Sequence, residues 1–183
     1  STPEFTLRAV HTPGHVSNHF CFFLEEERML FAGDHIMNGS TVVIVPPSGD
    51  MKAYIESLQL LLRYPLRLIA PGHGEVIEES EAEIRHLVAH RLGRESKVVA
   101  GLERVGVGDL DQLVVVVYDD VDPALHPWAK KSLEAHLLKL EKEARAQVSR
   151  HCRRQWLCPK RCPCCPLRHH RRHRVSRHRR GLR

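Results

Sequence analysis

The sequence lacks any apolar run as long as the roughly 18 residues that a membrane-spanning helix requires, so no transmembrane segment is predicted in its 183 residues. Its N-terminal segment also lacks the basic stretch and the apolar core of a secretory signal. No initiator methionine is present, so we expect the chain to begin part-way through a gene. The sequence therefore predicts no membrane partner.

Acidic residues are absent from the C-terminal segment. Residues 150–183 hold 13 of the 28 Lys and Arg and no Asp or Glu, which leaves 15 basic and all 22 acidic residues in 1–149, a net charge of −7. Because this segment also has almost no hydrophobic periodicity, residues 148–183 are predicted to be a basic, disordered tail. An out-of-frame translation beginning near Gln147 explains the abrupt change best. Electrostatic binding of nucleic-acid phosphates by the tail is the alternative.

Cysteine is nearly absent from the body of the chain, where Cys21 stands alone. One isolated cysteine is typical of a reducing compartment, so a cytoplasmic protein is expected. The other five cysteines lie in the tail, and their spacing, from Cys158 to Cys165, fits no common zinc-knuckle pattern. Cysteine usage therefore predicts neither a disulfide framework nor a knuckle.

The first half of the chain alternates strand-like runs with turn signals. Residues 20–24 form an apolar run typical of a strand buried on both faces, and Asp50 is expected to cap a helix over 51–64. The strands expected besides this one are 5–10, 29–32, 40–45 and 66–70. Strand, helix and strand in this order predict an α/β domain over residues 1–79.

The second half of the body has helical periodicity. A long helix is predicted over 80–104, a short helix or strand over 109–117, and a last helix over 128–145. Three helices of this kind predict a small winged-helix-like domain over residues 80–147.

Three tight turns, each following a strand-like run, carry metal-donor side chains. They are residues 11–15 (His-Thr-Pro-Gly-His), 33–35 (Gly-Asp-His) and 70–74 (Ala-Pro-Gly-His-Gly). Glycine lets such loops approach closely, and imidazole and carboxylate are donors that zinc and similar ions prefer. One turn is weak evidence, but three together favour a metal site.

In this order and at these distances, the three turns resemble the later metal motifs of the metallo-β-lactamase superfamily. The helical segment 80–147 is similar to the winged-helix appendage of that superfamily's β-lactamase-like protein 2 branch. The resemblance implies a partial αββα sandwich followed by a winged-helix-like domain. It also implies a metal-dependent hydrolase, and some members of the branch act on RNA.

The resemblance implies a role for each matching residue. His15 would complete a first zinc site, Asp34 would bridge two zinc ions, and His73 would bind the second ion. Zinc-bound hydroxide would then attack an ester, thioester or phosphodiester substrate. His11, His19 and His35 are interpreted as residues that support a ligand or contact substrate.

The chain departs from the family pattern in one respect. The family's His-x-His-x-Asp-His motif, which supplies the other ligands, does not occur in these 183 residues. The resemblance leaves His15 and Asp34 for one ion and Asp34 and His73 for the other, whereas catalytic zinc usually has three protein ligands. We therefore expect residues 1–79 to be the C-terminal half of the metallo-β-lactamase domain and the chain alone to be inactive, with no catalytic residue assigned. The alternatives are a nucleic-acid-binding module built on the helical domain and tail, or a purely structural α/β domain.

Overall fold

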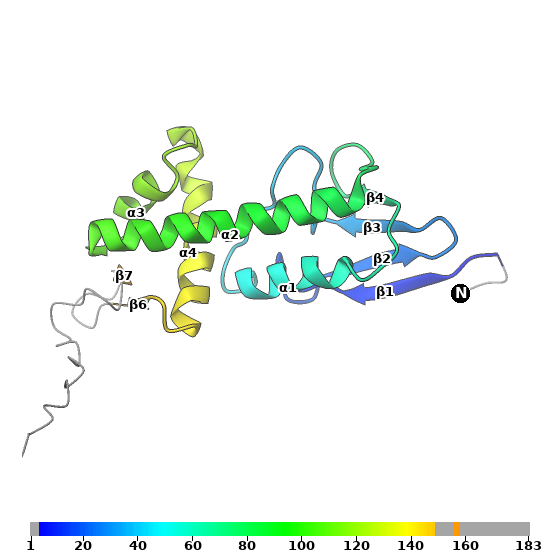
Figure 1. Ribbon diagram of the computed structural model, residues 1–183, viewed down its shortest axis with the longest axis horizontal. Coiled ribbons are helices and arrows are strands. Elements are labelled where there is room, and N and C mark those ends of the chain that lie inside the picture. Colours follow the sequence, from blue (N-terminus) through cyan, green and yellow to red (C-terminus); the bar gives the residue numbers. More distant parts are fainter. Residues whose placement is uncertain (1–3, 149–155, 158–183) are drawn as a thin grey trace, which may run out of the picture.

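The computed structural model describes residues 4–148 and 156–157. A four-stranded sheet with its helices lies at one end, a group of helices lies at the other, and one long helix runs along both (Figure 1). Among the described residues, no helix is both long and apolar enough to cross a membrane. Most of the predicted basic tail lies outside the described residues.

The sheet has the strand order β1-β2-β3-β4. Its strands are β1 (Leu7–His11), β2 (Phe20–Leu24), β3 (Met29–Gly33) and β4 (Leu68–Pro71). The first three form an antiparallel meander, and β4 pairs with β3 in parallel after a crossover through α1 (Met51–Leu61). Asp50 caps α1 as predicted, because its side chain accepts a 3.0 Å hydrogen bond from the backbone N–H of Ala53.

Only one face of the sheet is buried. Cys21 and Phe23 belong to the first hydrophobic core, whereas Phe20 and Phe22 are 47% and 42% exposed. The prediction that residues 20–24 are buried on both faces was therefore wrong. The helices cover one face of the sheet (Figure 1), and Phe20 and Phe22 of β2 are exposed on the other.

Residues 40–45 do not form the strand that their β-prone sequence predicts. Val42 and Ile44 are buried, but side chains satisfy the backbone of this segment in place of a neighbouring strand. Arg91 donates a 2.5 Å hydrogen bond to the carbonyl oxygen of Val42, and the N–H of Ile44 donates to Ser132 Oγ over 3.4 Å. The segment is a buried connection held by distant helices.

The second half contains α2 (Ser80–Val105), α3 (Leu110–Val117), a 3-10 turn η1 (Pro123–Leu125) and α4 (His126–Lys142). The short strands β5 (Val107–Gly108), β6 (Gln147–Val148) and β7 (Trp156–Leu157) form a small sheet in the order β5-β7-β6. These elements surround a second core that includes Leu113, Leu137 and Trp156. The pattern left residues 109–117 open between helix and strand, and the structure shows a helix over Leu110–Val117 with Asp109 as its N-cap.

Helix α2 takes part in both cores. Ile84 and Leu87 near its start pack in the first core, and Val98 and Leu102 near its end pack in the second. Figure 1 shows this helix extending from the sheet to α3 and α4. The two halves of the chain therefore share a single rigid element.

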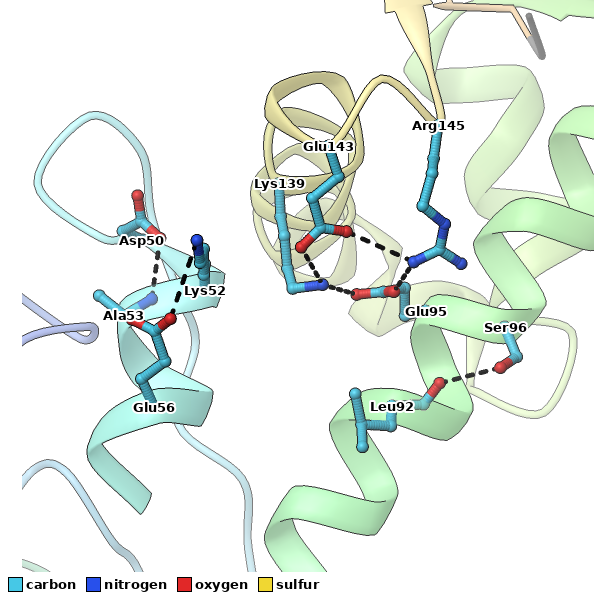
Figure 2. Close-up of polar contacts among 10 residues, drawn as sticks. All are labelled: Asp50, Lys52, Ala53, Glu56, Leu92, Glu95, Ser96, Lys139, Glu143 and Arg145. Atoms are coloured by element: carbon cyan, nitrogen blue, oxygen red, sulfur yellow. Dashed lines mark hydrogen bonds and ion pairs between the residues drawn. The ribbon is translucent and has the colours of Figure 1, made fainter. Parts of the chain in front are cut away.

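A buried ion network fixes α4 against α2. Glu95 is only 4% exposed, and its carboxylate accepts hydrogen bonds from Lys139 Nζ (2.6 Å) and Arg145 Nη1 (2.5 Å). Glu143 pairs with both of these cations, so the four side chains converge on one point (Figure 2). A second link joins α4 to α1, where Lys142 Nζ lies 2.6 Å from Asp50 Oδ2.

Candidate metal centre

The strand directions bring the three predicted turns to one edge of the sheet. Because β1 and β3 are both antiparallel to β2, and β4 is parallel to β3, the C-terminal ends of β1, β3 and β4 point the same way. The start of β2 lies at that edge too, where Phe20 pairs with His11. Polar residues that follow these strand ends therefore gather in one region.

His15 is held by a turn that packs directly on α1. A side chain at Gly14, whose φ is +142°, would place its Cβ 2.3 Å from the Cα of Tyr54, so only glycine fits. The Nδ1 of His15 lies 3.1 Å from the carbonyl oxygen of Val43. A carbonyl oxygen only accepts, so Nδ1 carries the proton and the lone pair of Nε2 stays available to a metal ion.

Asp34 and His73 meet across β3 and β4. His73 Nε2 lies 3.4 Å from Asp34 Oδ1, and both side chains are at least half exposed. Gly72 makes this approach possible, since its N–H donates a 2.8 Å hydrogen bond to the carbonyl oxygen of Gly33 and a Cβ here would lie 2.9 Å from Asp34 Oδ1. The two donors are thus placed by backbone contacts between adjacent strand ends.

Asn38 fixes the His73 loop from the other side. Its side-chain Nδ2 donates a 3.0 Å hydrogen bond to the carbonyl oxygen of Glu75, and its backbone N–H donates a 3.4 Å bond to that of His73. The loop therefore cannot move away from the Asp34 turn without breaking both bonds.

His19 points from the start of β2 toward the same turn. Its Nδ1 lies 2.9 Å from Thr12 Oγ1, and the Thr12 hydroxyl itself donates to Cys21 Sγ over 3.2 Å. The hydroxyl oxygen thus accepts from Nδ1–H, which leaves the lone pair of Nε2 near Gly33. Burial, followed by the neighbouring His15, lowers the pKa of His19, so its neutral form is favoured.

His35 lies beneath the site rather than on its surface. It is fully buried, stacks near His19 with ring centroids 5.4 Å apart, and its carbonyl oxygen accepts a 3.0 Å hydrogen bond from Tyr54 Oη. Neither ring nitrogen has a partner among the described residues. Burial is the main reason that its pKa falls to about 3, so the ring is neutral.

His11 is exposed at the end of β1. Its Nε2 lies 3.2 Å from the carbonyl oxygen of Ser17, and its ring lies against Phe20 with centroids 4.9 Å apart. The first of these contacts connects it to the loop that carries His15. Its supporting role, like those of His19 and His35, stays a prediction.

The chemistry of these donors fits a metal ion, but their number does not. Neutral imidazoles and a carboxylate suit zinc or iron. Within the described parts of the chain, however, no group of three or more His, Cys, Asp or Glu side chains is close enough to hold a metal. The ligand roles of His15, Asp34 and His73 therefore stay predictions.

Sequence reasoning missed a second group of polar residues, which lines a cavity between the two halves. Arg91 and Arg94 are 3% and 9% exposed. They follow Ile84 and Leu87 at helical spacing on the buried side of α2. Charged residues inside an apolar helical stripe are a signal that the sequence offered, because buried charges require a partner.

Comparison with known proteins agrees with the fold. Residues 2–73 match the family model of the metallo-beta-lactamase superfamily, and residues 110–156 match that of the beta-lactamase associated winged helix domain. The chain belongs to the metallo-β-lactamase superfamily and carries that winged-helix domain, as the sequence predicted.

Its relatives include the beta-lactamase-like protein 2 homolog of Drosophila melanogaster, which is 35% identical over 152 residues, 82% of this chain and 50% of the relative. The atrochrysone carboxyl ACP thioesterase of Emericella nidulans is 33% identical over 126 residues, 68% of this chain and 40% of the relative. The chain thus spans about half the length of the curated relatives it matches.

Solved structures show the same fold. A metallo-beta-lactamase family protein from Thermus thermophilus superimposes with a TM-score of 0.73 at 23% identity, covering 86% of this chain and 51% of that protein. A beta-lactamase domain protein from Burkholderia ambifaria also gives 0.73, at 21% identity, with coverages of 86% and 49%.

Proposed function

We propose that this chain supplies part of the active site of a metal-dependent hydrolase that cleaves a carboxylic ester or thioester. The observation that carries the proposal is the approach of His73 to Asp34, 3.4 Å apart at the edge of the sheet where His15 also lies. The thioesterase among its relatives favours a carbonyl substrate over a phosphodiester.

The residues of this chain would bind and orient. His15, Asp34 and His73 would hold the zinc ions through their imidazole and carboxylate groups. When bound, such ions supply an activated water and positive charge beside the scissile carbonyl. The hydrogen bond from His15 to Val43 and the contacts of Asn38 would hold the donors in place before substrate arrives.

We further propose that the chain alone is inactive, because the donors it contributes are too few for a catalytic zinc site. The exposed apolar face of the sheet supports this view. Phe20, Phe22 and Phe31 are each more than 40% exposed there. An apolar face of this kind is typical of a sheet that packs against a second layer.

A chimera tests the function. The region of the Drosophila relative that precedes its match would be joined to the N-terminus of this chain, and hydrolysis of a chromogenic aryl thioester would be followed after dialysis against zinc. We expect zinc-dependent turnover by the chimera, none by the chain alone, and loss of turnover in chimeras carrying Asp34→Ala or His73→Ala. A chimera that folds and binds two zinc ions yet hydrolyses neither ester nor thioester would contradict the proposal.

The nucleic-acid alternative gains no support from the described residues. Its main element, the basic tail, falls almost entirely outside them, and RNA as a substrate or partner stays a prediction. A filter-binding measurement with and without residues 150–183 would address it, since phosphate contacts give a strong dependence on salt.

A further inference from the structure

A cavity of about 350 Å³ lies between the two halves of the chain. Its walls come from residues 40–43, from α2, from residues 118–125 that follow α3, and from the start of α4. The volume falls within the range of small-molecule sites, which span about 300–1,000 Å³. The cavity adjoins the candidate metal centre, because Val43 lines it and its carbonyl oxygen accepts the hydrogen bond from His15.

Arg91 brings a buried charge to this cavity without a carboxylate to balance it. Its side chain donates to the carbonyl oxygen of Val42 and lies 5.3 Å from the ring centre of Tyr54. None of the described Asp and Glu side chains forms an ion pair with it, and its Nε has no hydrogen-bond partner among the described residues. A buried cation in this state favours an anionic partner.

Arg94 differs from its neighbour in this respect. It forms an ion pair with Asp120, with Nη1 and Oδ1 2.7 Å apart, and its guanidinium lies 4.2 Å from the ring centre of Tyr118. Its charge is therefore already balanced, and it holds the Tyr118 ring in position.

Tyr118, which lines the same cavity, has an unused hydrogen-bonding group. The residue is 7% exposed, yet its hydroxyl has no partner among the described residues. Buried hydroxyls without a partner are uncommon in native proteins. The phenol hydroxyl can donate to an anion that Arg91 attracts.

The rim of the cavity is apolar and open. Trp128 and Leu125 line it and are 63% and 54% exposed, although both are large apolar side chains. Arg91, Arg94 and Tyr118 are thus buried polar residues of the lining, whereas Trp128 and Leu125 are exposed apolar ones. This arrangement suits a ligand whose anionic group enters first and whose apolar body stays near Trp128.

We propose that this cavity binds an organic carboxylate with a flat apolar body, through Arg91 and Tyr118 at the carboxylate and Trp128 at the body. The site is separate from the metal ligands, and its occupation does not depend on the proposed hydrolase activity.

Titration with 1-naphthoate, followed by the indole N–H resonances of the 15N-labelled chain, tests the proposal. Only Trp128 and Trp156 give such resonances. Because Trp156 belongs to the second core and does not line the cavity, we expect saturable shifts of the Trp128 signal alone. The neutral analogue 1-naphthamide is expected to bind about tenfold more weakly, since charge-assisted hydrogen bonds are the stronger ones.

Variants separate the two polar contacts. Tyr118→Phe removes a hydroxyl that bonds to no described residue in the free chain, so we expect unchanged thermal unfolding and naphthoate binding weaker by about three- to tenfold. Arg91→Met is expected to abolish the preference for the acid over the amide. Arg85→Met, at an exposed arginine on the same helix, is the matched control.

Three outcomes would overturn the proposal. They are equal affinity for naphthoate and naphthamide in the parent chain, equal shifts at both tryptophans, or a folded Tyr118→Phe variant with unchanged affinity. Because this last variant does not depend on the stability of Arg91→Met, the test stands even where Arg91→Met fails to fold.

Discussion

The imidazole Nε2 of His73 lies 3.4 Å from Asp34 Oδ1, although the two residues follow different strands. The parallel pairing of β3 and β4 places Gly33 opposite Pro71, and this register brings the following side chains together. The pair is therefore a consequence of strand order rather than of any local sequence motif.

Loss of either member of this pair should weaken metal binding by more than about 100-fold in the full-length chimera. Loss of a residue that only supports a metal ligand already lowers metal affinity by about 10–100-fold. Competition with a chromogenic zinc chelator would measure the effect in Asp34→Ala and His73→Ala. His86→Ala is the control, since this exposed histidine belongs to α2 and to none of the three donor-bearing turns. Equal affinities in all three variants would exclude Asp34 and His73 as ligands.

Replacement of Gly14 by alanine should destabilise the chain by at least about 2 kcal/mol, because the new Cβ would overlap the backbone of α1 at Tyr54. Gly93→Ala offers a matched control within α2, where a Cβ meets nothing within 4 Å. That variant should stabilise the chain by about 0.5–1 kcal/mol through helix propensity. Urea unfolding measures both changes, and a neutral Gly14→Ala variant would contradict the packing of this turn.

Glu95→Gln should cost about 3 kcal/mol of stability, since it removes the buried carboxylate that Lys139 and Arg145 share. Glu81→Gln, which removes an exposed ion pair with Arg85 on the same helix, should change stability by less than about 0.5 kcal/mol. Comparison of their urea midpoints tests whether the network in Figure 2 stabilises the contact of α2 with α4. Similar midpoints would show that it does not.

His136 should make stability depend on pH. Burial, followed by Arg91 and Lys139, lowers its pKa in the folded chain to about 3, from an ordinary value of 6.5. Below pH 6.5 the unfolded chain therefore binds the extra proton more readily, so this contribution is complete above pH 6.5 and is lost as pH falls toward 3. The loss reaches about 2 kcal/mol near pH 5.

The variant His136→Leu isolates this contribution. Both ring nitrogens of His136 are buried without a partner among the described residues, so an apolar side chain should be tolerated at neutral pH. As pH falls from neutral to about 5, the unfolding free energy of the parent should fall relative to that of the variant. A constant difference would mean that His136 is not buried in its neutral form.

Local patterns predicted most elements of the fold because their signals are local. Turn residues bound each of the four sheet strands, and Asp50 marked the start of α1. The strand predicted over residues 40–45 was wrong for a non-local reason. Their β-branched run needs hydrogen-bond partners, and these come from Arg91, Ser132 and His15, far away in the chain.

The candidate site likewise has parts that local sequence indicated and parts that depend on non-local contacts. The three donor-bearing turns were visible as strings of residues, and the structure places them at one sheet edge. The position of His35 was not visible, because neighbouring residues in a turn point in different directions: Asp34 is half exposed, whereas His35 is fully buried. The cavity between the halves depends on four separate segments, so no single stretch of sequence indicated it.

The continuity of α2 has a mechanical consequence. At about 1.5 Å per residue, its 26 residues form a rod of about 39 Å that carries part of both cores. A hinge between the halves would have to break this helix, and its sequence contains no proline. The cavity beside Arg91 should therefore keep one size, so that it selects ligands by fit rather than by closing around them.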